Sequence, residues 1–180
     1  MAKFKITLDT NAIINHFDLV HTSPTSRAEL EEIMQMWEDN EIDVAITTRV
    51  EADLGQDRDK ARRDAMLAKA EVLPVFGSIF RLSSSDLDGA DVMMSDKHKD
   101  TVKKIADILS PAGIDRNAKT FLNKINDVDH LAGHKMAGRD VFVTDDGTMN
   151  KKAPELKVLG IEVMRHAEAL VEIRRRLHSL

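Results

Sequence analysis

Cysteine is absent from this chain, which excludes disulfides and thiolate metal sites. A protein without cysteine suits a reducing compartment, and we expect a cytoplasmic location. The N-terminus also lacks a signal-peptide pattern, and no apolar run approaches the roughly 18–20 residues that a helix needs to cross a bilayer. These absences predict a protein that has no membrane partner.

An excess of basic residues is missing as well. The formal net charge is −5 and the pI is about 5.8, which excludes a protein that coats nucleic acid through charge alone. Two interpretations remain: no nucleic-acid partner, or an acidic catalytic cluster offset by local basic patches. Repeats and low-complexity tracts are missing too, and 180 residues with 42% apolar content predict one globular domain.

Short apolar segments alternate with helical patterns along the chain, and this alternation predicts the fold. We expect strands over 3–8, 42–47, 72–76, 140–144 and 161–164. We expect helices over 12–20, 23–40, 48–55, 58–70, 95–109, 118–125, 126–137 and 148–156, and from 167 onward. Alternating strands and helices imply right-handed crossovers and a parallel sheet that is covered on both faces. We therefore predict a three-layer α/β/α sandwich, with Pro74 placing its strand at an edge.

Acidic residues follow the strands of this predicted sheet. Asp9 ends the first strand, Glu51 falls within one helical turn of the second, and Asp145 and Asp146 follow the strand 140–144. Ligands of open parallel sheets bind outside the carboxyl ends of the strands, so we expect these acids to approach one another there. Clustered carboxylates need raised pKa values or a divalent cation between them, and hard oxygen ligands suit Mg²⁺ or Mn²⁺.

Most of these acids also have a structural interpretation. Thr48 and Glu51 have the spacing of a capping box. Asp127 and Asp129 would lie in the first turn after an Asn126 cap, where acids meet the helix dipole favourably. They project roughly 200° apart on a helix, so we do not expect both to serve one metal. The joint occurrence of the acids at one edge favours the functional interpretation.

Two histidines, His130 and His134, are four residues apart on one predicted helix, a spacing that can hold zinc. The glutamate of the His-Glu-x-x-His motif is absent, and no third ligand is evident. We therefore predict packing for His130, and either packing or a contact at the edge of the site for His134.

Four acidic segments stand in a recognisable order. They are Leu8-Asp9-Thr10-Asn11, Glu51 with Gly55 four residues on, Asp127-Val128-Asp129-His130-Leu131-Ala132, and Asp140-Val141-Phe142-Val143-Thr144-Asp145-Asp146. In this order the chain resembles the PIN-domain family, small metal-dependent nucleases that include VapC-type toxin ribonucleases. Residues 1–55 and 126–170 carry the resemblance. The middle, about 77–125, has no match and is expected to be an extended helical insertion within a single PIN-like domain over 1–180.

The resemblance implies a Mg²⁺- or Mn²⁺-dependent endoribonuclease. Its metal ligands and catalytic acids would be Asp9, Glu51, Asp127 and Asp146, with Asp129 and Asp145 as competing ligands. Metal-activated water would hydrolyse the RNA phosphodiester bond and leave a 5′-phosphate and a 3′-hydroxyl.

Other residues would support this chemistry. Thr10, Asn11 and Thr144 would orient carboxylates or water, and Lys151, Lys152, Arg58 and Arg62 would contact backbone phosphates. A toxin of this kind would be expected to have a small antitoxin protein as partner and to form a homodimer.

Three other functions are weighed against this one. A catalytically silent PIN-fold module would bind RNA or protein, but it has no use for four acids. A nuclease acting on structured DNA would keep the same chemistry. A dehalogenase-like phosphatase also opens on a strand-ending aspartate, but it needs a second aspartate where this chain has Asn11.

Overall fold

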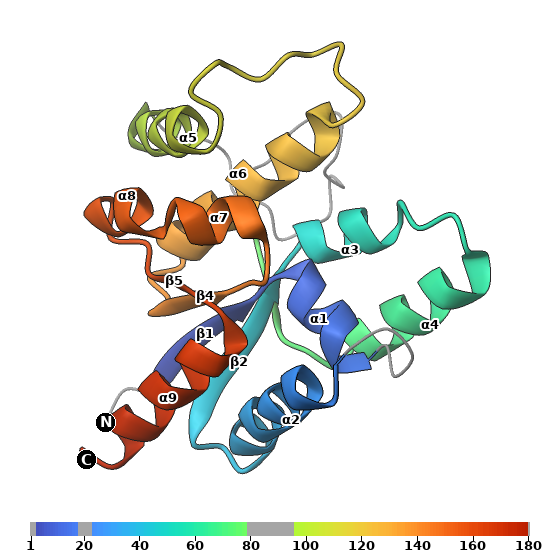
Figure 1. Ribbon diagram of the computed structural model, residues 1–180, viewed down its shortest axis with the longest axis vertical. Helices are drawn as coiled ribbons and strands as arrows, with labels where there is room; N and C mark the ends of the chain where they lie inside the picture. The colour runs from blue at the N-terminus through green and yellow to red at the C-terminus, as the bar shows by residue number, and fades with distance from the viewer. Residues whose placement is uncertain (1–2, 18–22, 79–95, 180) are drawn as a thin grey trace.

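A five-stranded, fully parallel sheet forms the centre of the molecule (Figure 1). The computed structural model describes residues 3–17, 23–78 and 96–179. The strands are β1 (Phe4–Leu8), β2 (Ile42–Thr47), β3 (Val75–Phe76), β4 (Val141–Val143) and β5 (Val163–Met164), in the order β3-β2-β1-β4-β5. The predicted three-layer α/β/α architecture is confirmed, and β3 is an edge strand, as Pro74 indicated.

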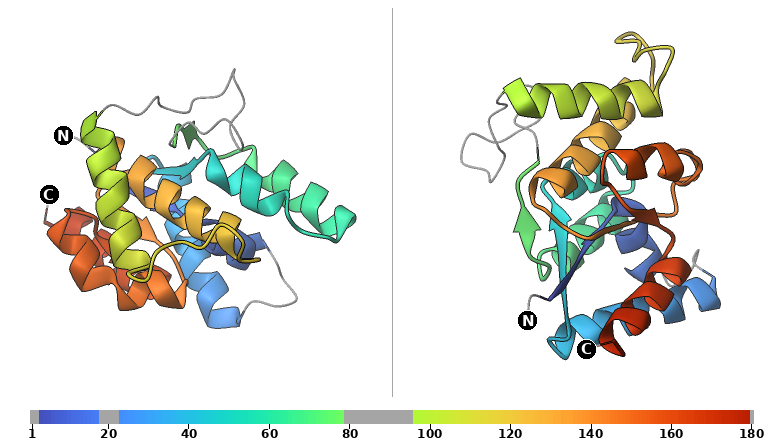
Figure 2. Two further views of the ribbon diagram at one scale, coloured as in Figure 1. Left: turned by 90° about the horizontal axis from the view of Figure 1, so that it is seen from above. Right: turned by 90° about the vertical axis from the view of Figure 1, so that its left-hand side faces the viewer.

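Helices cover both faces of the sheet (Figures 1 and 2). They are α1 (Thr10–Phe17), α2 (Pro24–Glu38), α3 (Arg49–Leu54), α4 (Lys60–Ala70), α5 (Asp96–Leu109), α6 (Phe121–Met136), α7 (Gly147–Lys151), α8 (Ala153–Val158) and α9 (His166–Leu177). One core joins the sheet to α1, α2, α3, α4 and α9, and the other joins it to α5, α6, α7 and α8. In the described ranges, no helix combines the length and apolarity needed to span a bilayer.

Side chains of β1 alternate between the two cores, as the pleat of a strand requires. Ile6 and Leu8 belong to the first core, whereas Thr7 faces α6 and contacts His134 there. Leu8 pairs with Ile46 on one side and with Val143 on the other. The central strands therefore end level with one another, and the residues that follow them meet at one edge.

The second half of the chain differs from the prediction in how its helices are divided. A single helix, α6, replaces the two expected over 118–125 and 126–137, so Asn126 lies inside a helix and is not its cap. The segment expected as one helix up to Leu156 is divided into α7 and α8, with Pro154 in the first turn of α8. Proline fits a first turn because it has no N–H to donate there. Part of the middle segment expected as an extended helical insertion, residues 79–95, lies outside the described residues.

Candidate active site

Five aspartates line one pocket of about 550 Å³ at the carboxyl edge of the sheet, and one of them, Asp57, is paired with Arg62. The other four are the candidate metal ligands. Asp9 follows β1, Asp53 lies in α3, Asp127 lies in α6, and Asp146 caps the N-terminus of α7. Four separate elements thus bring a carboxylate to the place where ligands bind in parallel sheets. Asp9, Asp127 and Asp146, three of the four acids expected from the sequence, line this pocket. Asp53 lines it in place of the fourth, Glu51.

Glu51 is the acid that the structure does not bring to the pocket. It is exposed and lines a separate hollow of about 210 Å³ beside β3. Asp53 follows two residues later, and two residues correspond to roughly 200° around a helix, so the two side chains leave α3 on opposite sides. The capping-box alternative is not observed either. The Thr48 side chain makes no capping hydrogen bond, and the backbone N–H of Thr48, which Glu51 would accept in a capping box, donates to Phe76 O at 3.2 Å.

Asp9 is almost fully buried at the end of β1. Thr144 Oγ1 donates to its Oδ2 at 2.6 Å, and the backbone N–H of Thr10 donates to its Oδ1 at 2.8 Å. Burial raises the pKa of Asp9, and it outweighs the positive charge of His130 and these hydrogen bonds, which lower it. This carboxylate is therefore rigidly held and short of positive charge.

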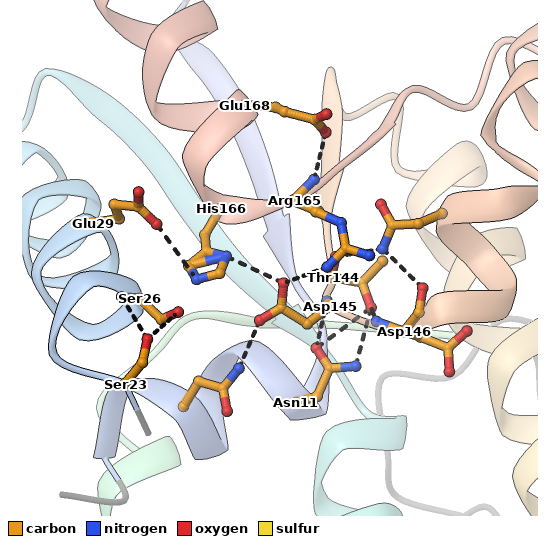
Figure 3. A network of polar contacts seen from close by, with 12 residues as sticks. Asn11, Ser23, Ser26, Glu29, Thr144, Asp145, Asp146, Arg165, His166 and Glu168 are labelled. Carbon is orange, nitrogen blue, oxygen red and sulfur yellow. Dashed lines mark hydrogen bonds and ion pairs between the residues drawn. The ribbon is translucent and has the colours of Figure 1, made fainter. Parts of the chain in front are cut away.

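Asn11 ties the end of β4 to the start of α1. Its amide Nδ2 donates to Thr144 Oγ1 at 3.1 Å, and its Oδ1 accepts the backbone N–H of Asp145 at 2.9 Å (Figure 3). Thr10, Asn11 and Thr144 thus contact the acids by direct or relayed hydrogen bonds.

The adjacent acids Asp145 and Asp146 point in different directions (Figure 3). Asp145 Oδ2 accepts from Asn15 Nδ2 at 2.7 Å, and its Oδ1 lies 3.2 Å from His166 Nδ1, away from the pocket. Asp146 accepts the N–H groups of residues 148 and 149 through Oδ1 alone, and its Oδ2 makes no hydrogen bond to any described residue. Of the two, the pocket is lined by Asp146.

A buried arginine separates the roles of Asp127 and Asp129. Arg49 and Asp129 are both fully buried, and the Arg49 Nε lies 3.5 Å from Asp129 Oδ2. Asp127 instead faces the pocket and makes no hydrogen bond to a described residue. Burial, followed by the negative charges of Asp9 and Asp146, raises its pKa to about 7.

Asp53 is the most firmly hydrogen-bonded of the four acids. Its Oδ2 accepts from Thr10 Oγ1 at 3.0 Å and its Oδ1 from Asn126 Nδ2 at 2.5 Å. His130 Nε2 also lies 3.0 Å from Oδ2. Burial raises the pKa of Asp53, but the hydrogen bonds and the charge of His130 outweigh burial and lower it.

Of the two histidines of α6, His130 has a different role from the one predicted, whereas His134 packs against the sheet as expected. His130, expected only to pack, contacts Asp53 and lies 3.9 Å from Asp9 Oδ1. The sequence could have indicated this position. His130 is three residues after Asp127, and side chains three residues apart are neighbours on a helix surface. His134 contacts Thr7 on the sheet, and burial together with Arg139 and Lys135 lowers its pKa to about 3.

Basic side chains form another wall of the same pocket. Arg58, just before α4, and Arg62 and Arg63, in its first turn, line it together with the acids. Arg62 Nη1 is paired with Asp57 Oδ2 at 3.0 Å. The predicted basic residues beyond α7 are placed elsewhere: Lys151 lines a groove of about 560 Å³ and Lys152 pairs with Glu155 at 2.9 Å.

The donor chemistry of the pocket suits a hard divalent cation such as Mg²⁺ or Mn²⁺, because its potential ligands are carboxylate oxygens. Burial raises the pKa values of Asp9 and Asp127, and a bound cation would stabilise their ionised forms. In the part of the chain that the structure describes, no group of three or more acidic or histidine side chains has the spacing to hold one ion. Binding through three or more of them would therefore require some of these carboxylates to move closer together.

No model of a known protein family matches the chain, and no curated protein matches its sequence.

Proposed function

We propose that this PIN-like protein is a Mg²⁺- or Mn²⁺-dependent nuclease that hydrolyses RNA phosphodiester bonds. The acids that would hold the metal are Asp9, Asp53, Asp127 and Asp146. The observation that supports this proposal most directly is their convergence on one pocket that also has an arginine wall. A divalent cation, when bound, supplies a Lewis acid and lowers the pKa of a coordinated water.

The proposed ligands differ in how firmly the protein holds them. Asp9 and Asp53 are fixed by hydrogen bonds, which suits ligands that must not drift during the reaction. Asp127 has no such bond and holds a proton up to a pH of about 7, so it is the ligand whose ionisation would accompany metal binding.

The arginine wall supports a polyanionic substrate. Arg58 is exposed in the pocket wall, and Arg62 and Arg63 are half-buried beside it. Guanidinium groups bind phosphate oxygens in a fixed planar geometry, and they would hold a backbone phosphate close to the acids. The protein's net charge of −5 is compatible with this arrangement, because the positive charge is local.

Cleavage of single-stranded RNA with millimolar Mn²⁺ tests the proposal. Wild-type protein should produce fragments with 5′-phosphate and 3′-hydroxyl ends, and Asp9→Asn should lose this activity. Equal cleavage by both proteins would contradict the proposal. A structured DNA substrate in the same assay decides between RNA and DNA.

Mn²⁺ titration of thermal stability separates a nuclease from a silent binding module. A working site should raise the midpoint of unfolding as Mn²⁺ is added, since a ligand that binds only the folded state stabilises it. A silent module should show no change. An antitoxin and a homodimer belong to the same proposal, and size-exclusion chromatography of the pure protein tests the homodimer.

A further inference from the structure

One buried imidazole contacts two of the four acids from behind. His130 has no exposed surface, and its Nε2 lies 3.0 Å from Asp53 Oδ2 and 3.9 Å from Asp9 Oδ1. Asp53 comes from α3 and Asp9 from the end of β1, so a single side chain of α6 contacts acids from two different elements.

The ring itself is held from the sheet. His130 Nδ1 lies 2.6 Å from Thr47 Oγ1, at the end of β2, and the ring stands edge-on to Phe142 with centroids 6.2 Å apart. Because the Asp53 carboxylate can only accept, His130 Nε2–H must donate to it. This hydrogen bond places a proton on Nε2 and fixes the position of Asp53 Oδ2.

We infer that His130 is a positioning residue that holds Asp53 beside Asp9 for the binding of a shared cation. The inference rests on the proposed function. His130 does not line the pocket, so it touches neither substrate nor solvent. Groups that hydrogen-bond metal ligands from behind are typically worth about 10–100-fold in metal affinity or activity.

The neighbouring His134 offers a matched control. It is equally buried, lies one helical turn later on α6, and contacts a strand threonine in the same way, with its Nδ1 2.8 Å from Thr7 Oγ1. It makes no contact with an acid of the pocket. A variant at His134 therefore reports the cost of losing a buried imidazole without disturbing the acids.

Two substitutions at His130 separate positioning from packing. Gln places its Nε2 amide near the position of the imidazole Nε2 and can still donate to Asp53. Asn reaches only as far as Nδ1 and can replace the bond to Thr47 alone. His130→Asn should raise the Mn²⁺ concentration at half-maximal thermal stabilisation at least about tenfold. His130→Gln and His134→Asn should both stay within about threefold of wild type.

RNA cleavage supplies a second measurement on the same proteins. His130→Asn should lower kcat while leaving KM for RNA unchanged, because the ring does not reach the pocket. If His130→Asn does not fold, Thr47→Val replaces it, because this change frees the ring and removes no contact with an acid. Thr47→Val should also raise the Mn²⁺ midpoint, the Mn²⁺ concentration at half-maximal thermal stabilisation. Thr7→Val, its counterpart beneath His134, should not.

The outcomes distinguish this inference from the proposed function. A wild-type protein that neither binds Mn²⁺ nor cleaves RNA overturns both. An active wild type with equal Mn²⁺ midpoints for His130→Asn and His134→Asn overturns the positioning role alone. The same holds if His130→Gln is no better than His130→Asn.

Discussion

Asp53 and Glu51 are two residues apart in α3, yet only Asp53 faces the pocket. Asp53→Asn should therefore reduce Mn²⁺-dependent cleavage by more than about 100-fold, since even groups that only orient metal ligands are worth about 10–100-fold. Glu51→Gln, its isosteric control on the opposite side of the helix, should stay within about twofold of wild type. Initial rates on one RNA substrate measure both. Loss of activity in Glu51→Gln alone would reverse the assignment.

Asp127 makes the metal-free protein less stable at neutral pH than at acidic pH. Its folded pKa of about 7 lies above its ordinary value of 3.8, so the unfolded chain ionises first as the pH rises. The loss of stability caused by ionising Asp127 in the folded protein is absent below about pH 4, grows up to pH 7 and is complete above it. Each pKa unit corresponds to about 1.4 kcal/mol, which sets an upper limit on the order of 4 kcal/mol.

Asp127→Asn removes that cost, so it should stabilise the metal-free protein at pH 8 by about 1–4 kcal/mol and leave it nearly unchanged at pH 4. Urea unfolding at the two pH values in the presence of a chelator measures the difference. The same variant should lose Mn²⁺-dependent cleavage. A destabilised Asp127→Asn protein at pH 8 would show that the acid has a structural partner.

The choice among neighbouring acids marks the limit of what the sequence could predict. Asp9 and Asp146 follow strands, and the register of a parallel sheet brings strand ends together whatever the helices do. In α3, which has only six residues, no periodic pattern was long enough to show that Asp53 faces inward. Asp129 was excluded only by the buried Arg49, which is distant in sequence and gave no local signal.

At the scale of elements, α3 and α6 are joined by a buried ion pair between Arg49 and Asp129. Arg49→Met should lower the free energy of unfolding by about 3–5 kcal/mol, because it leaves a buried carboxylate without its partner. The double variant Arg49→Met, Asp129→Leu should recover much of that loss, since apolar groups can replace a buried pair. Denaturant unfolding of the single and double variants measures the coupling, and additive losses would contradict it.

Helix boundaries were harder to predict than helix existence. The strands and α5 lie close to their expected positions, because apolar runs and helical spacing are local signals. Asn126 suggested a cap from its chemistry, but its amide instead bonds Asp53 from within α6. That partner is 73 residues away, and a contact of such separation is invisible to any local pattern.

For the whole molecule, cation binding and proton release should be coupled. Asp127 is protonated below about pH 7 in the metal-free protein, so Mn²⁺ must displace that proton. The Mn²⁺ midpoint should fall by about tenfold for each pH unit between pH 5 and 7 and level off above pH 7, and Asp127→Asn should flatten this dependence. Thermal unfolding across a grid of pH and Mn²⁺ measures it. A flat profile in wild type would remove Asp127 from the set of ligands.

The position of β1 in the sheet determines how much of the chain must be synthesised before the site can form. The first strand in the sequence is the central one; its neighbour β2 follows it closely in sequence, whereas its neighbour β4 comes only after most of the chain. Pairing across so long a separation is slow, because loop closure must precede the contact. A nascent chain that has reached only β3 carries Asp9 and Asp53, but neither Asp127 nor Asp146. On the proposed function, translation would therefore keep the enzyme inactive toward RNA, its own messenger included, until β4 has docked.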